Sequence, residues 1–322
     1  MKRIAIMVLA LALVLSGVAA SAQAVTVGII QYATHPSLDN CTKGFIEGLA
    51  EGGYKEGDNL TIDFQNAMAD MAIGDMQAKL MVSQGRDMLV GVATPAAMSA
   101  YAATADSGTP VIFVAVSDAV SAGIVESNEA PNTNCTGVSD ILNLPEQVKM
   151  IRAFLPEAKK IGVVYTVSEP NSISHLKKLH EVAAEQGFEV VAIGITAGSE
   201  VATAAGSLIA DGVDCFNNFT DNLVVENLPA LLLAAEEARI PVFGSEVEQV
   251  VNGCLATQGI DYVALGREAG KIAAEVLNGK ADPATTPVGL IDEVTPAYNA
   301  DVLAALGLQL PAGYEAAQDV AK

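Results

Sequence analysis

Short β-prone runs alternate with amphipathic helical segments along most of the chain, and this alternation constrains the fold more than any other feature. A first series has strands expected at residues 25–31, 60–64, 88–93 and 111–115. A second series has strands expected at residues 161–165, 189–193, 215–219 and 242–244. Alternating segments of this length are typical of parallel, doubly wound sheets. The sequence therefore predicts an α/β fold with two Rossmann-like lobes, each built on such a sheet.

The division of the chain between the two lobes follows from where the series restart. We expect residues 25–140 and about 262–290 to form lobe 1, and residues 141–261 and about 291–322 to form lobe 2. No linker is long or rich in proline or serine. Short crossings between two lobes suit a hinge with a cleft between them.

The first 24 residues have the layout of a secretory signal peptide. Lys2 and Arg3 precede an apolar run at residues 4–15, and small residues end in the sequence Ala22-Gln23-Ala24. This pattern predicts cleavage after Ala24, and the apolar run is short for a membrane-spanning helix. We therefore expect a periplasmic protein that is not inserted in the membrane after cleavage.

The charge balance excludes one large class of partners. The chain has 17 basic and 38 acidic residues, and loss of Lys2 and Arg3 would leave 15 basic residues. Strong acidity favours solubility and disfavours binding to phosphate backbones and anionic lipid surfaces. We expect no nucleic-acid partner and, without any signal for assembly, a monomer.

Catalytic and metal-binding motifs are missing from the sequence. It has no G-x-S-x-G, GxxxxGK[ST] or HExxH pattern, so we expect no enzymatic activity. The cysteines are widely spaced, which predicts unpaired thiols, no metal site and no cofactor. His35 is interpreted as a polar contact or an exposed residue rather than a general base, and His175 and His180 are expected on the solvated face of a helix. The four cysteines are Cys41, Cys135, Cys215 and Cys254.

Candidate ligand-binding residues are those that follow the predicted strands, because ligands of open α/β sheets bind beyond the carboxyl ends of the strands. Small hydroxyls, amides and carboxylates recur at these positions, although the same residue types also serve as helix N-caps. The candidates are Gln31, Tyr32, Thr94, Pro95, Ala96, Ser117, Asn171, Ser172, Thr220, Asp221, Asn222, Ser245 and Glu246.

The chemistry of these candidates suits a zwitterion. A helix beginning near Pro95 would direct its free N–H groups toward the cleft, which favours a carboxylate, and Thr94 and Ser117 could add hydroxyl contacts. Asp221 and Glu246 would supply negative charge for an ammonium group. The sequence thus predicts a small zwitterionic ligand, most simply an amino acid, whose side-chain pocket depends on Tyr32, Leu38 and Phe219.

Several motifs along the chain carry a family resemblance. They are GIIQYATHPSLD (28–39), GFIEGL (44–49), GYKEGDN (53–59), DFQNA (63–67), ATPAA (93–97), AVSDAV (115–120), TGVSD (136–140), SEPNS (168–172), TDN (220–222), IPVF (240–243) and GIDYVALGREAGK (259–271). In this order they resemble the ABC transporter substrate-binding family that includes the TrpX-like aromatic amino acid binding proteins. The resemblance spans about residues 25–310. It implies the type I periplasmic binding protein fold and an ABC permease as the partner.

Two departures and several alternatives accompany this resemblance. The family usually has proline where this chain has Ala119, and often has a further acidic residue after Ser245-Glu246. The leading hypothesis is an ABC importer component that delivers an amino acid, aromatic or branched, to a permease by hinge closure. The alternative is a periplasmic sensor that docks on a chemoreceptor or receptor kinase, which would have the same cleft. Sugar binding is less favoured because the chain has no tryptophan and few aromatic residues.

Overall fold

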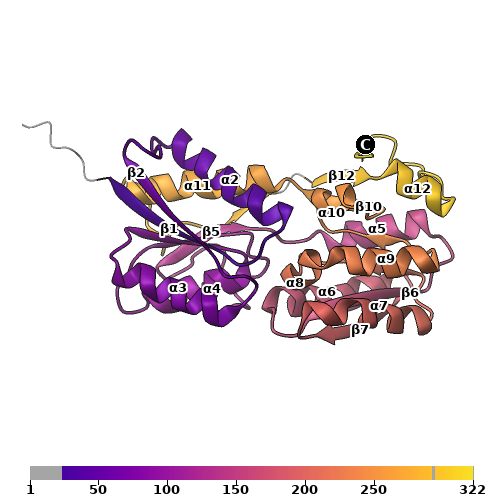
Figure 1. Ribbon diagram of the computed structural model, residues 1–322. Coiled ribbons are helices and arrows are strands. Elements are labelled where there is room, and N and C mark those ends of the chain that lie inside the picture. The colour runs from indigo at the N-terminus through magenta and orange to yellow at the C-terminus, as the bar shows by residue number, and fades with distance from the viewer. Residues whose placement is uncertain (1–23, 292–293, 322) are drawn as a thin grey trace, which may run out of the picture.

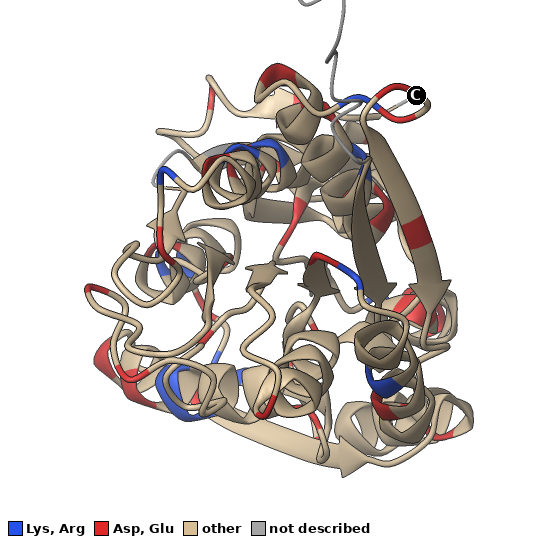
Figure 2. Ribbon diagram, turned by 90° about the vertical axis from the view of Figure 1, so that its left-hand side faces the viewer, with Lys and Arg blue, Asp and Glu red and all other residues tan. Residues whose placement is uncertain are grey.

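A computed structural model describes residues 24–291 and 294–321 and consists of two α/β lobes that lie side by side (Figure 1). The predicted signal peptide, apart from Ala24, lies outside the described residues. No helix in the described part of the chain is long and apolar enough to cross a membrane. Acidic residues outnumber basic ones, in line with the net charge of −21, and Figure 2 marks both kinds along the ribbon.

The first lobe contains a six-stranded sheet in the order β11-β5-β4-β3-β1-β2, with every pair of neighbours parallel. Strands β3, β4 and β5 are buried along their whole length, as expected for a parallel sheet covered on both faces. The strands are β1 (Val25–Gln31), β2 (Leu60–Asn66), β3 (Met88–Val92), β4 (Val111–Val114), β5 (Cys135–Ser139) and β11 (Gly289–Leu290).

Helices cover both faces of this sheet, with α3 (Met71–Ser83) and α4 (Thr94–Thr104) on one face and α2 (Pro36–Glu51) and α11 (Tyr262–Leu277) on the other (Figure 1). The backbones of α2 and α11 approach very closely. A Cβ atom added to Gly44 would lie 2.1 Å from the carbonyl oxygen of Val263. Glycine is required there because any side chain would push the two helices apart.

The second lobe contains a parallel four-stranded sheet in the order β7-β6-β8-β9. Its strands are β6 (Lys160–Thr166), β7 (Glu189–Ile195), β8 (Cys215–Asn217) and β9 (Val242–Phe243). Its helices are α5 (Leu144–Phe154), α6 (Pro170–Glu185), α7 (Val201–Ala210), α8 (Asn222–Glu226), α9 (Leu228–Ala238) and α10 (Val247–Val251), and a 3₁₀ turn spans Gly198–Glu200.

A third, small sheet adds a feature that the alternating pattern does not predict. Strand β10 (Ala256–Ile260) pairs antiparallel with β12 (Val294–Tyr298), which pairs parallel with β13 (Gln318–Asp319). The last helix, α12 (Ala300–Leu306), follows β12. The partner of β10 thus comes from near the end of the chain.

The side chain of Gln147, on helix α5, connects the four-stranded sheet of the second lobe to the small third sheet. The side-chain nitrogen of Gln147 donates to Asn217 Oδ1 at 3.1 Å and to the carbonyl of Gly244 at 2.8 Å. Its oxygen accepts from the backbone nitrogen of Gln258 in β10 at 2.9 Å. Because buried amides must be hydrogen-bonded, Gln147 holds β8, β9 and β10 in a defined relation.

Two expectations about polar side chains have different outcomes. His180 is exposed, as predicted, but the prediction for His175 is wrong: it is 6% exposed and its ring lies 5.5 Å from that of Phe219. The helix α6 is covered on the His175 side, which a lone histidine in a polar helix does not reveal. The four cysteines are buried and free, as predicted.

Candidate functional site

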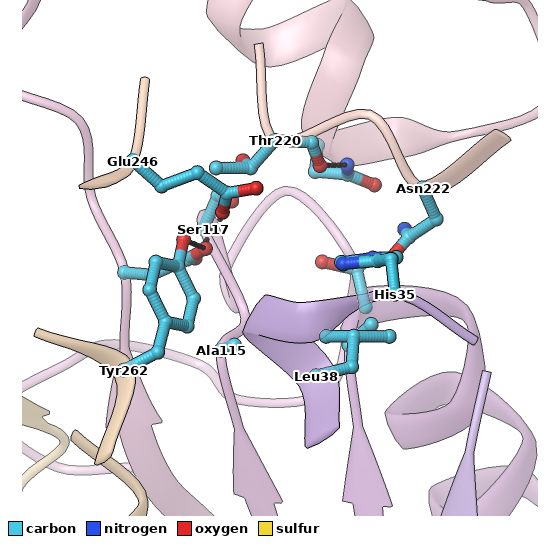
Figure 3. A pocket seen from close by; sticks show the side chains of 12 residues that line it. His35, Leu38, Ala115, Ser117, Thr220, Asn222, Glu246 and Tyr262 are labelled. Atoms are coloured by element: carbon cyan, nitrogen blue, oxygen red, sulfur yellow. Dashed lines mark hydrogen bonds between the residues drawn. The ribbon is translucent and has the colours of Figure 1, made fainter. Parts of the chain in front are cut away.

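A small cavity lies between the two lobes, at the carboxyl ends of the strands of both parallel sheets (Figure 3). The first lobe contributes residues that follow β1, β3, β4 and β5, together with the first residue of α11. The second lobe contributes residues that follow β8 and β9 and the start of α6. The lining residues are His35, Leu38, Ala93, Thr94, Ala115, Ser117, Asp140, Asn171, Thr220, Asn222, Glu246 and Tyr262.

One wall of the cavity is acidic. Asp140 accepts hydrogen bonds from Ser117 Oγ and from the Tyr262 hydroxyl, each at 2.8 Å. Burial raises the pKa of Asp140 to about 6. Glu246 is 1% exposed, and its burial raises its pKa to about 8, with a smaller contribution from the negative charge of the nearby Glu248. No lysine or arginine is among the described residues that line the cavity, so this wall favours a cationic group.

The opposite wall is formed by an imidazole and amide groups (Figure 3). His35 Nε2 lies 3.4 Å from Asn222 Oδ1, and burial lowers the pKa of His35 to about 4. Behind this wall, Glu169 accepts from the backbone nitrogen of Asn222 at 3.1 Å and from its side-chain nitrogen at 2.6 Å. Glu169 also accepts from Asn171 Nδ2 at 3.1 Å. Burial raises the pKa of Glu169, and the negative charge of the neighbouring Asp221 raises it further.

Four polar side-chain atoms of the lining are buried without a hydrogen-bond partner among the described residues. Buried polar atoms are bonded in the great majority of cases, so each exception calls for a physical reason. Here the four surround one cavity, which indicates a place for polar groups of a bound molecule. The atoms are His35 Nδ1, Thr94 Oγ1, Asn171 Oδ1 and Thr220 Oγ1.

Helix α4 begins at the cavity wall, as predicted. Proline lies in its first turn, and Ala93, just before the helix, has φ = 77°. Ala115, after β4, has φ = 57°. Both alanines therefore have a positive φ, which non-glycine residues rarely adopt, and both line the cavity. Thr94, the first residue of α4, lines the cavity, so the N-terminus of this helix lies at the cavity wall, where the helix dipole favours an anion.

The predicted site residues divide into two groups. Those that line the cavity are Thr94, Ser117, Asn171, Thr220, Asn222 and Glu246. Those that lie outside the lining are Gln31, Tyr32, Pro95, Ala96, Ser172, Asp221 and Ser245. Members of the second group have partners inside the protein: the Tyr32 hydroxyl donates to the Ala69 carbonyl at 3.0 Å, and Ser245 Oγ donates to the Asn218 carbonyl at 2.6 Å.

Asp221 is the most instructive member of the second group. Its carboxylate accepts from the backbone nitrogen and hydroxyl of Thr166 at 2.6 and 2.7 Å, and from Ser172 Oγ at 2.6 Å. It also accepts from the backbone nitrogen of Val224 at 3.0 Å and thereby caps α8. Both carboxylate oxygens of Asp221 are thus engaged in hydrogen bonds that hold the last residue of β6 and the first turn of α6 beside α8.

Other lining residues were not among the predicted ligand contacts. Asp140 ends the segment after β5, and its position at a strand end was a usable signal. Tyr262 is the first residue of α11 and lies far along the sequence from the other lining residues of the first lobe. No local pattern indicates that its ring faces the cavity. His35 follows β1 and was interpreted as a polar contact or an exposed residue; it is buried, with 7% of its surface exposed. Among the described residues there is no group of three or more histidine, cysteine or acidic side chains arranged to hold a metal ion.

Comparison with known proteins agrees with this architecture. A sequence model of the ABC transporter substrate binding protein family matches residues 26–317. A tyrosine-binding protein of Clostridioides difficile (strain R20291) is 44% identical over 283 residues, which are 88% of this chain and 81% of that protein.

Solved structures with the same two-lobed fold include both a complex and a ligand-free form. A Streptococcus pneumoniae ABC domain in complex with L-Trp has a TM-score of 0.88 at 34% identity, covering 92% of this chain and all of that one. A ligand-free, open substrate-binding protein from Clostridium difficile has a TM-score of 0.70 at 38% identity, covering 92% of this chain and 99% of that one. The fold is that of the type I periplasmic binding proteins, and the chain belongs to the ABC transporter substrate-binding protein family.

Proposed function

We propose that this protein binds a free aromatic amino acid in the cavity between its lobes and delivers it to an ABC permease. The observation that carries the proposal is the cavity itself: it combines two buried carboxylates, the N-terminus of α4 and four polar atoms that have no partner among the described residues. A few convergent polar groups in an enclosed site fix the orientation of a small ligand.

The two walls of the cavity suit the two charges of an amino acid. The ammonium group would lie against Glu246 and Asp140, since both carboxylates are buried without a basic partner in the lining. The carboxylate would lie at the start of α4, where Thr94 Oγ1 is unpartnered and the helix dipole is favourable. In this arrangement Glu246 has the role that the sequence assigned to both Asp221 and Glu246.

An aromatic side chain is supported by the remaining lining and by the relatives. Leu38, Ala93, Ala115 and the Tyr262 ring supply apolar surface beside the polar groups. One relative is named for tyrosine binding, and a structural relative was solved with L-Trp. The small alanines at two strand ends would allow a ring to lie close to the backbone when the ligand binds.

Hinge closure is supported by the two structural relatives. The TM-score with the L-Trp complex is higher than the TM-score with the open, ligand-free protein, although the sequence identity to the open protein is higher. The difference is therefore best explained by the arrangement of the lobes. We place the lobe boundaries at residues 25–140 with about 262–290, and at 141–261 with about 291–322, so that three crossings form the hinge.

Delivery to a permease implies export, and the predicted signal peptide at residues 1–24 would place the mature chain in the periplasm. Family membership supports an ABC permease as the partner. The test is ATP hydrolysis by the reconstituted permease complex, which we expect to rise when the loaded protein is added. No stimulation by the loaded protein would instead favour a sensor.

The ligand assignment is tested by thermal unfolding. The mature protein would be unfolded, refolded to remove bound ligand, and melted in the presence of each of the twenty amino acids. A ligand that binds only the folded state at a hundredfold excess over Kd adds about 2.7 kcal/mol of stability. We expect a clear rise in Tm with aromatic amino acids and none with glycine or lysine. No shift with any aromatic amino acid would overturn the proposal.

A further inference from the structure

One lining residue has an unused acceptor in a fixed position. His35 is 7% exposed, and its Nδ1 has no hydrogen-bond partner among the described residues. Burial keeps the imidazole neutral, with a pKa of about 4. A neutral imidazole has one N–H donor and one acceptor nitrogen, and its neighbours decide which nitrogen is which.

The neighbours of His35 specify its tautomer. Asn222 directs its side-chain nitrogen at Glu169 Oε2, at 2.6 Å, because only an N–H can donate to that oxygen. The same oxygen accepts from the backbone nitrogen of Asn222, which is a donor in every state. Glu169 Oε2 accepts three N–H groups, whereas Oε1 accepts only one among the described residues, from the backbone nitrogen of Leu223 at 3.2 Å. A proton on Glu169 is therefore accommodated on Oε1, and Oε2 remains an acceptor.

The orientation of Asn222 is thereby passed on to His35. With its nitrogen directed at Glu169, Asn222 presents Oδ1 to His35 Nε2 at 3.4 Å. Nε2 must then carry the proton, and Nδ1 is left with a lone pair. A series of contacts thus runs from Glu169 through Asn222 to His35 and ends in a buried acceptor nitrogen at the cavity.

The position of His35 Nδ1 relative to the acidic wall determines which part of the ligand can donate a hydrogen bond to it. Figure 3 shows His35 and Asn222 on the side of the cavity opposite Glu246 and Tyr262. An ammonium group held by the acidic wall is therefore directed away from His35. The donor that reaches Nδ1 has to come from another part of the ligand.

We propose that His35 Nδ1 accepts a hydrogen bond from the ligand's side chain, so that the protein prefers aromatic amino acids with a phenol O–H or an indole N–H over phenylalanine. This inference rests on the proposed function and names the group that distinguishes among its substrates. A ligand without the donor leaves Nδ1 buried and unpaired, a loss that corresponds to about 10- to 100-fold in affinity.

The first experiment is calorimetric titration of the refolded protein with tyrosine, tryptophan and phenylalanine. We expect tyrosine or tryptophan to bind about 10- to 100-fold more tightly than phenylalanine. His35→Leu should reduce this ratio to near one by weakening binding of the hydroxylated or indole ligand, and His35→Gln, which retains an acceptor oxygen, should keep part of it.

The matched control is His175→Leu. His175 is also buried, and both of its ring nitrogens are unpartnered among the described residues, but it does not line the cavity. The ratio should be unchanged in this variant. Equal affinity of the wild-type protein for the three ligands would overturn the inference and leave the proposed function intact, whereas no binding of any of them would overturn the proposed function.

A second measurement does not depend on any variant folding correctly. Nitrogen NMR of the wild-type protein labelled in histidine reports the tautomer directly. We expect His35 to show a protonated Nε2 and an unprotonated Nδ1 at neutral pH, and the Nδ1 resonance to move when tyrosine is added but much less with phenylalanine. An Nδ1–H tautomer, or equal responses to both ligands, would contradict the proposal.

Discussion

The side-chain nitrogen of Asn40, on helix α2 of the first lobe, donates to Glu248 Oε1, on α10 of the second lobe, at 2.7 Å. A second contact between the lobes joins Ser174 Oγ to Asp118 Oδ2 at 2.8 Å. None of these four residues lines the cavity. The two hydrogen bonds therefore stabilise the arrangement of the lobes without touching the ligand, and by mass action they strengthen binding.

Removing these contacts should weaken ligand binding from a distance. In the Asn40→Ala, Ser174→Ala double variant we expect a loss of about 1–3 kcal/mol in binding free energy, since each hydrogen bond contributes about 0.5–1.5 kcal/mol. The loss should appear mainly as faster dissociation in stopped-flow experiments. Lys178→Ala, which removes an ion pair within α6, is the control and should have no effect. Unchanged dissociation in the double variant would show that the two contacts do not hold the closed arrangement.

Glu246 should couple ligand binding to proton release. Burial raises its pKa to about 8, and an ammonium group beside it would favour the ionised form. Below pH 8, binding should release a proton, and affinity should rise with pH by up to about tenfold per unit until it levels off near pH 8. Calorimetry in two buffers with different ionisation enthalpies measures this release.

Glu246→Gln is the variant that checks the pH effect. We expect it to weaken binding by about 2–5 kcal/mol and to flatten the pH dependence, because the partner of the ammonium is lost. Glu236→Gln, at an exposed site on α9, serves as the control. If proton release persists in Glu246→Gln, another group, such as Asp140, carries it.

The same burial predicts how stability without ligand depends on pH. The pKa values of Asp140 and Glu246 are raised to about 6 and about 8, above those of unfolded chains. Burial also lowers the pKa values of His35 and His175 to about 4, and this acts in the opposite direction up to the unfolded histidine value of about 6.5. Between about pH 6.5 and 8 the folded state therefore binds more protons than the unfolded state, and the free energy of unfolding should fall as pH rises. Denaturant titrations at pH 6.5, 7 and 8 measure the trend, and it should be smaller in Glu246→Gln. A stability that rises across this window would contradict the assignment.

The close contact of α2 and α11 makes a separate stability prediction. Gly44→Ala should destabilise the protein by about 1–3 kcal/mol, because the added Cβ would meet the Val263 carbonyl at 2.1 Å. Gly206→Ala is the matched control, since Gly206 lies within α7 with nothing within 4 Å of the added atom. That change should be neutral or stabilising by up to about 1 kcal/mol. Urea denaturation of both variants checks the difference, and equal stabilities would refute the packing argument.

The sequence by itself determined the element types and, to within two residues, the positions at which the predicted strands of the two parallel sheets end. The period of the apolar residues predicted the strands and helices of both lobes, and the rule that ligands bind beyond strand ends led to Thr94, Ser117, Asn171, Thr220, Asn222 and Glu246. These features are local, because each depends on residues close together in the chain. The cap preferences of threonine and asparagine also belong to this local level.

Only the tertiary structure decided which of the polar side chains face the cavity. Asp221 and Glu246 both follow strands of the second lobe, yet Asp221 is held by Thr166 and Ser172 from another segment, whereas Glu246 lines the cavity. Tyr262 reaches Asp140 across 122 residues of chain, and β12 supplies the antiparallel partner of β10 from near the C-terminus. A side chain's direction depends on its hydrogen-bond partners, and those partners come from segments that no local pattern connects.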